Sequence, residues 1–185
     1  MIWNEVICLG DSITFGARDE YDRSYTSELP SILENITKEL WVCHNYGING
    51  ETSSNLLRRT WRNISSHHQA KIVCLMIGTN DTKIPMPEEI YEDNLKQIIN
   101  ICKIQGKFVL IGTLPPLSLN PNYRNNLEYI EKYNSIIKKL AKNHKIELAE
   151  FDDISEYLID GVHFGNAGYK KIAEIWSKSI LKIQE

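Results

Sequence analysis

The stretch "KIVCLMIG", residues 71–78, decides the fold class. An unbroken apolar run lies between a lysine and a glycine, which is typical of a strand buried on both faces in a parallel sheet. Four similar runs predict further strands, the last of them weaker than the others, at 5–10, 40–47, 107–112 and 146–151.

Longer stretches separate these runs, and in them apolar residues recur every three or four positions. They predict helices at 24–37, 53–64, 87–106, 125–144 and 166–183. In the first, the regular part should begin near Pro30, because proline fits a first helical turn. In the second, Ser53 or Ser54 is expected to cap the N-terminus, and Trp61 in "RRTWR" (58–62) to pack inward from a solvated face. Alternating strands and helices predict an α/β fold with a parallel sheet covered on both faces.

Length and composition narrow the class of protein. The 185 residues show no linker or repeat, which predicts a single domain over 1–185. The net charge of -3 disfavours a nucleic-acid partner. The four cysteines form no C-x-x-C pair. Three of them, Cys8, Cys43 and Cys74, lie inside apolar runs and are expected to be buried free thiols in a reducing compartment. With neither a signal peptide nor a membrane span evident, we expect a soluble, cytoplasmic protein.

The segments that follow the strands are where a ligand should bind, because open α/β sheets bind ligands at the carboxyl ends of their strands. Ser12 lies in "GDS" directly after the first strand, and the other strands are followed by "GINGETS", "GTND", "GTLPP" and a loop with "DGVH". A serine at this edge becomes a nucleophile only when a base and an orienting group are within reach.

His163 is the histidine that fits this role. The other four histidines lie inside a strand or near helix ends, namely His44, His67, His68 and His144. Asp160 precedes His163 by three residues, a spacing that brings two side chains to one face of a turn. We therefore predict a Ser12–His163–Asp160 triad with Ser12 as nucleophile, His163 as general base and Asp160 orienting it.

Acyl transfer also needs hydrogen-bond donors for the developing oxyanion. The predicted donors are the backbone N–H groups of Ser12 and Gly50 and the side-chain amide of Asn80. Taken singly, each residue has an ordinary structural interpretation: Ser12 as a helix cap, Gly50 as a turn glycine and Asn80 as a turn residue. Their combination with the predicted triad is what favours catalysis.

Four segments resemble the conserved blocks I, II, III and V of the SGNH hydrolases, a subgroup of the GDSL esterases and lipases. They are "GDSITFG" (10–16), "NYGINGETS" (45–53), "GTND" (78–81) and "DGVHFGNAGY" (160–169). The resemblance extends from residue 5 to about 180 and implies a flavodoxin-like, three-layer α/β/α sandwich with a five-stranded parallel sheet. It also implies serine esterase chemistry without a metal or other cofactor. Ile13 replaces the leucine of the family's name-giving motif.

Three loops are expected to shape the substrate pocket: 17–25, 82–87 and 114–124, the last with Leu117 and Leu119 lining an acyl site. This mixture of polar and apolar residues predicts a small-molecule ester substrate, most simply a short acetyl ester of a carbohydrate or small metabolite.

The alternatives are a lysophospholipase or acyl-thioesterase, a flavodoxin-like module that binds a phosphate or nucleotide, and a non-catalytic carbohydrate-binding protein. The phosphate-binding alternative is disfavoured because no glycine-rich phosphate motif follows the first strand. The sequence leaves the oligomeric state open.

Overall fold

A computed structural model describes residues 3–21, 23–118 and 124–183. One parallel sheet runs through the molecule in the strand order β2-β1-β3-β4-β5. Its strands are β1 Asn4–Gly10, β2 Trp41–Gly47, β3 Ile72–Met76, β4 Phe108–Gly112 and β5 Glu147–Ala149. All five strands lie within the predicted runs, except that β1 begins one residue earlier, and the predicted α/β class with a five-stranded parallel sheet is confirmed.

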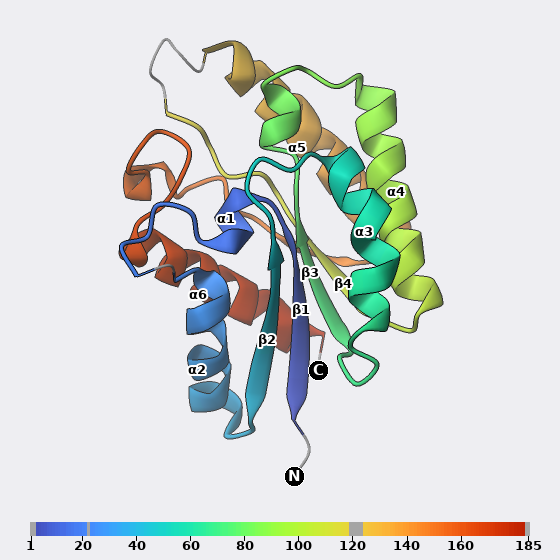
Figure 1. The fold of residues 1–185 in the computed structure, drawn as a ribbon, viewed down its shortest axis with the longest axis vertical. Coiled ribbons are helices and arrows are strands. Elements are labelled where there is room, and N and C mark those ends of the chain that lie inside the picture. Colours follow the sequence, from blue (N-terminus) through green and yellow to red (C-terminus); the bar gives the residue numbers. More distant parts are fainter. Residues whose placement is uncertain (1–2, 22, 119–123, 184–185) are drawn as a thin grey trace.

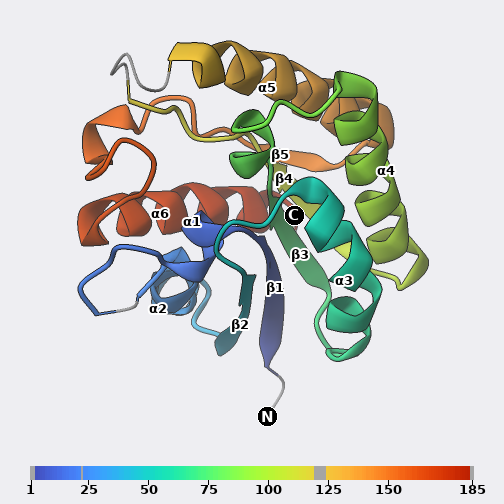
Figure 2. The same ribbon diagram turned by 45° about the horizontal axis from the view of Figure 1, so that its top comes forward.

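Helices cover both faces of this sheet (Figures 1 and 2). They are α1 Ser12–Phe15, α2 Tyr25–Thr37, α3 Ser53–Ser65, α4 Glu88–Ile104, α5 Arg124–His144 and α6 Asn166–Lys182. The described residues also form two short 3-10 turns, η1 Asn80–Thr82 and η3 Ser155–Tyr157.

The side chains of each strand alternate between two buried cores, as the pleat of a strand requires. On β1, Val6 and Cys8 face the core beneath α2 and α6, whereas Ile7 and Leu9 face the core beneath α3, α4 and α5. Both faces of β1 are thus buried away from solvent, which explains its continuous apolar sequence. The three-layer α/β/α arrangement follows directly.

Two details of the helix starts differ from the predictions. The α2 helix begins at Tyr25 rather than near Pro30, because the Ser24 hydroxyl caps it by accepting a hydrogen bond from the Thr26 N–H at 3.1 Å. The α3 helix is capped by Thr52 rather than by a serine, and Thr52 and Asn55 bond each other reciprocally in a capping box.

Two further expectations were wrong in part. Trp61 does not pack inward but has 56% of its surface exposed, on the outer face of α3. Of the three cysteines predicted to be buried, Cys8 and Cys74 are buried but Cys43 is only half-buried. None of the described helices is both long and apolar enough to cross a membrane.

Glycines let α1 lie directly on the ends of β1 and β2. A Cβ atom on Gly47 would collide with the backbone of Thr14 and Phe15, and one on Gly10 would collide with the Thr14 side chain. Only glycine permits such a close backbone approach. The first turn of α1, which carries Ser12, is therefore fixed at the carboxyl edge of the sheet.

Candidate active site

Ser12 is the first residue of α1 and follows β1 after a single intervening aspartate, Asp11. The carboxylate of Asp11 caps the helix by accepting a hydrogen bond from the Ile13 N–H at 3.0 Å. Gly16 ends the helix in the left-handed region, with φ at 101°, and its N–H donates to the Ser12 carbonyl. This tight turn leaves the Ser12 hydroxyl at the mouth of a cavity, with 7% of the residue exposed.

The structure brings Ser12, His163 and Asp160 into one hydrogen-bonded chain. The Nε2 atom of His163 lies 2.9 Å from the Ser12 Oγ, and its Nδ1 atom lies 2.8 Å from the Asp160 Oδ2. Asp160 Oδ1 also accepts hydrogen bonds from the backbone N–H groups of Val162 and His163. With Nδ1 donating to the carboxylate, Nε2 is left with the lone pair that can accept the serine proton.

The Asp160 carboxyl is suited to orient the imidazole. Burial alone would raise its pKa, but hydrogen bonds from the His163 backbone and ring and from the Val162 N–H outweigh this effect and lower the pKa. The Arg18 Nε lies 3.5 Å from the same carboxylate. The lowered pKa favours the ionised form of Asp160, which can accept a hydrogen bond from the His163 Nδ1–H and so favours that tautomer.

The three predicted oxyanion donors surround the same cavity. The N–H groups of Ser12 and Gly50 donate to no other residue within the described ranges. Gly50 adopts a φ of 78°, with open space where a side chain would be. Asn80 follows β3 and uses its side-chain Nδ2 to bond the Glu51 carbonyl at 2.9 Å, which leaves the second amide hydrogen for a ligand.

The cavity has a volume of about 370 Å³ and is lined mainly by polar residues. Its lining residues are Ser12, Phe15, Ala17, Arg18, Asn49, Gly50, Asn80, Lys83 and His163. The first two predicted pocket loops contribute to it through Arg18 and Lys83. The prediction for the third loop was wrong at Leu117, which is buried in the core beneath α5 and is not among the lining residues, while Leu119 lies outside the described residues.

The sequence interpretation treated "RRTWR" as a solvated helix face and so did not identify the structural role of Arg59. Its guanidinium is largely buried and bonds the Glu51 carboxylate, with Nε 2.8 Å from Oε2. Its Nη2 atom also donates to the carbonyls of Gly10 at 3.2 Å and Tyr46 at 2.8 Å. One side chain thus ties the ends of β1 and β2 to the loop that carries Gly50. Its spacing of three residues from the apolar Leu56 was the available signal.

Asp81, the last residue of the "GTND" segment, anchors the start of α3. Its carboxylate accepts hydrogen bonds from the Ser53 N–H and, at 2.6 Å, from the Ser53 hydroxyl. Burial raises the pKa of Asp81. Burial also raises the pKa of Asp11 to about 7, and the nearby charge of Asp81 adds to this shift. Two buried carboxyl groups therefore lie next to the site: Asp11 caps the helix that begins with Ser12, and Asp81 follows Asn80 and bonds Ser53.

A parallel α/β/α sheet with a hydrogen-bonded serine, histidine and aspartate at its carboxyl edge has the geometry of a serine hydrolase. Residues 8–171 match the model of the GDSL-like Lipase/Acylhydrolase family, and the chain belongs to this family.

Curated relatives and solved structures are similar to the chain at low identity. A multidomain esterase of Ruminococcus flavefaciens is 26% identical over 95% of the chain, and the human platelet-activating factor acetylhydrolase IB subunit alpha2 is 27% identical over 76% of it. The chain spans 28% and 65% of the lengths of these two proteins.

Solved structures share the fold over almost the whole chain. The lipase/acylhydrolase from Enterococcus faecalis superposes with a TM-score of 0.85 at 20% identity, over 96% of this chain and 95% of that one. Est24, a carbohydrate acetylesterase from Sinorhizobium meliloti, superposes with a TM-score of 0.82 at 19% identity, over 97% and 99% of the two chains.

Proposed function

We propose that this protein is a serine esterase that hydrolyses short acyl esters, with acetyl esters of a carbohydrate or another polar small molecule as its substrate class. The observation that carries this proposal is the continuous hydrogen-bonded chain from Asp160 through His163 to Ser12, which opens into a polar cavity. The family assignment favours this chemistry over the flavodoxin-like binding module.

The chemistry follows from the positions of the atoms. Ser12 Oγ attacks the ester carbonyl while His163 Nε2 takes its proton, and the negative charge develops on the carbonyl oxygen. The N–H groups of Ser12 and Gly50 and the Asn80 amide are available to bind that oxygen. The protonated imidazole then gives its proton to the departing alcohol, which leaves an acyl group on Ser12. Water, deprotonated by His163, releases the acid and restores the serine.

The preference for a short acyl group is supported by the walls of the cavity. Apolar lining is limited to Phe15 and Ala17, so little surface is available to bury a long acyl chain, and each buried methylene would contribute roughly 0.8 kcal/mol. The names of several relatives point in the same direction. They include the platelet-activating factor acetylhydrolase subunit, Est24 and an acetylxylan esterase from Geobacillus stearothermophilus.

A chain-length series of p-nitrophenyl esters, followed by a panel of acetylated sugars, tests this proposal. We expect kcat/KM to be highest for the acetate and to fall steadily through butyrate to octanoate. The Ser12→Ala variant is the matched control and should be inactive on every ester. Fastest turnover of octanoate or longer esters would replace the acetyl-ester proposal by the lysophospholipase or acyl-thioesterase alternative.

A further inference from the structure

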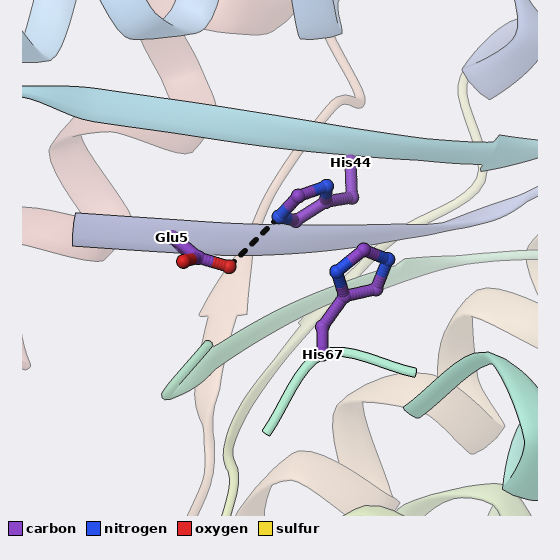
Figure 3. Close-up of side chains that lie close together, drawn as sticks. All are labelled: Glu5, His44 and His67. Atoms are coloured by element: carbon purple, nitrogen blue, oxygen red, sulfur yellow. Dashed lines mark hydrogen bonds and ion pairs between the residues drawn. The ribbon is translucent and has the colours of Figure 1, made fainter. Parts of the chain in front are cut away.

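Glu5, His44 and His67 form a cluster of metal-ligating side chains outside the catalytic site (Figure 3). One oxygen or nitrogen from each of them lies within 4.8 Å of the other two. We propose that these three residues bind a divalent transition-metal ion, and that Zn²⁺ is the ion that their two imidazoles and one carboxylate suit best.

The strand register creates this cluster. In the parallel pairing of β1 and β2, His44 lies beside Ile7, which is two positions after Glu5 and on the same face of the sheet. His67 comes from the segment that joins α3 to β3 and lies over that face (Figure 3). Glu5 is near the start of β1, whereas Ser12 follows the opposite end of the strand. The cluster is therefore separate from the catalytic cavity.

The ligand atoms of the three side chains are close together, although the two imidazole rings are stacked. The His44 Nε2 lies 2.9 Å from the Glu5 Oε2, and the His44 and His67 rings stack with their centroids 3.6 Å apart. Zinc bonds of about 2.0–2.2 Å in a tetrahedral site place the ligand atoms roughly 3.4 Å from one another. The three ligand atoms already lie within 4.8 Å of one another. Because an imidazole lone pair lies in the plane of its ring, the two stacked rings have to tilt apart for both to coordinate one ion.

Tyr46 fixes the second ring in the orientation that a ligand needs. Its hydroxyl lies 2.8 Å from the His67 Nε2, and the other ring nitrogen of His67 faces the Glu5–His44 pair in Figure 3. A metal-binding histidine usually donates its remote N–H to an oxygen, which leaves the near nitrogen free to coordinate. In the tautomer whose Nε2–H donates to the Tyr46 hydroxyl, Nδ1 of His67 carries the lone pair that can coordinate an ion.

Lys107 holds the segment that presents His67. Its ammonium donates to three backbone carbonyls, those of His67 at 2.9 Å, His68 at 3.3 Å and Ala70 at 2.6 Å. The position of His67 relative to the sheet is therefore set by the fold before any ion binds.

The side chains of the cluster are partly exposed to solvent. The side chains of His44 and Glu5 are 23% and 17% exposed, so an ion can enter and a water molecule can complete a four-coordinate site. Binding would replace the His44–Glu5 hydrogen bond by two metal bonds, with the His44 ring proton moved to its other nitrogen. The ion would link β1, β2 and the segment after α3, and so would stabilise the fold without entering the ester chemistry.

Calorimetric titration of the chelator-stripped protein with Zn²⁺ tests the proposal. We expect one ion per chain, and a fall in affinity of more than about 100-fold in His67→Ala and Glu5→Gln, with about 10-fold in the milder Tyr46→Phe. The matched control His68→Ala changes the adjacent histidine, whose ring is outside the cluster, and should bind Zn²⁺ like the wild type. Circular dichroism of each stripped variant shows whether it is folded.

A Co²⁺ titration followed by absorption spectroscopy identifies the ligands. Nitrogen and oxygen ligation without a thiolate charge-transfer band, retained in His163→Ala, supports the proposed site. The proposal is overturned if the stripped wild type binds neither ion. It is equally overturned if His67→Ala binds like the wild type, or if binding is lost in His163→Ala.

Discussion

At the scale of single residues, the two hydrogens of the Asn80 side-chain amide have different surroundings. One hydrogen of its Nδ2 goes to the Glu51 carbonyl, and the other is available to a substrate oxygen in the cavity. The first contact orders the amide before substrate arrives, which is the preorganisation that oxyanion stabilisation requires.

Replacing Asn80 by alanine should therefore lower kcat by roughly 10²–10³, with a much smaller change in KM. Steady-state kinetics on p-nitrophenyl acetate measures both values. The Asn80→Asp variant is the control for shape, because it keeps the size of the side chain but cannot donate, and it should be equally impaired. A kcat within about 2-fold of the wild type in both variants would remove Asn80 from the oxyanion site.

Asp11 gives the stability of the protein a pH dependence of unusual sign. Its folded pKa of about 7 lies above the ordinary value of 3.8, so the folded state holds this proton more tightly than the unfolded state. The contribution of Asp11 to stability is complete below about pH 4, is lost as the pH rises to about 7, and is constant above that.

The Asp11→Asn variant should lack this loss, because its side chain stays neutral and its carbonyl can still accept from the Ile13 N–H. We expect the Tm of wild type relative to the variant to fall by at least about 3 °C between pH 5 and pH 7.5. Differential scanning calorimetry at both values checks this. A Tm difference that is constant with pH, or that rises, would contradict a raised pKa at Asp11.

Single residues differed in how far the sequence could identify them. Ser12 could be predicted because it follows the first strand at the carboxyl edge of the sheet. His163 could be predicted because it lies on a loop expected at the same edge, and Asp160 because it is three residues from His163. Arg59 was not predictable in its role, because its carbonyl partners on Gly10 and Tyr46 come from strand ends distant in the sequence.

At the scale of elements, the loop 48–52 between β2 and α3 has to be held in place, since it carries Gly50. Arg59 bonds this loop through Glu51, and Asp81 holds Ser53 at the loop's far end. A shift of about 1 Å in a catalytic group can cost about 100-fold in rate, so these anchors bear on turnover although neither needs to contact substrate.

Replacing Arg59 by methionine keeps the apolar stem and removes the hydrogen bonds. We expect kcat/KM for p-nitrophenyl acetate to fall by at least about 10-fold, because Gly50 is no longer fixed. Arg58→Met is the matched control, since Arg58 is the exposed neighbour on the same helix, and it should retain full activity. Equal activities of the two variants would show that Arg59 does not position the loop.

The elements themselves were largely predictable, because buried parallel strands are apolar without interruption and helices show a period of three to four residues. Their starts were less predictable. The hydrogen bond that caps α2 comes from Ser24 ahead of Pro30, and the capping box of α3 depends on a reciprocal contact between Thr52 and Asn55.

At the scale of the whole molecule, positive charge gathers at the cavity from two separate loops. Arg18 lies close to Asp160, whereas Lys83 is exposed and forms no ion pair with any residue of the described ranges. The Lys83 ammonium is thus available to an anionic group on the alcohol part of a substrate.

Acetyl esters of an acidic and a neutral alcohol of similar size test this. In Lys83→Met we expect KM to rise about 3- to 10-fold for the acidic ester and to stay unchanged for the neutral one. Lys178→Met changes an exposed lysine of α6 outside the cavity lining and should alter neither value. Equal effects on the two esters would contradict a charge-selective cavity.

The layered architecture was predictable from the alternation of strands and helices, but the juxtaposition of Glu5, His44 and His67 was not. It depends on the register between β1 and β2 and on where the segment after α3 lies over them. In the sequence these residues are far apart, and His44 alone gives no sign that it faces Glu5.

The central claim is that Ser12, activated by His163, is the nucleophile. Labelling of the whole protein with a fluorophosphonate, followed by mass spectrometry of its peptides, tests this most directly. We predict one adduct on Ser12 in the wild type, none in Ser12→Ala, and a strongly slowed reaction in His163→Ala. An adduct on another residue, undiminished labelling of Ser12→Ala, or a folded wild-type protein that stays unlabelled would contradict the claim.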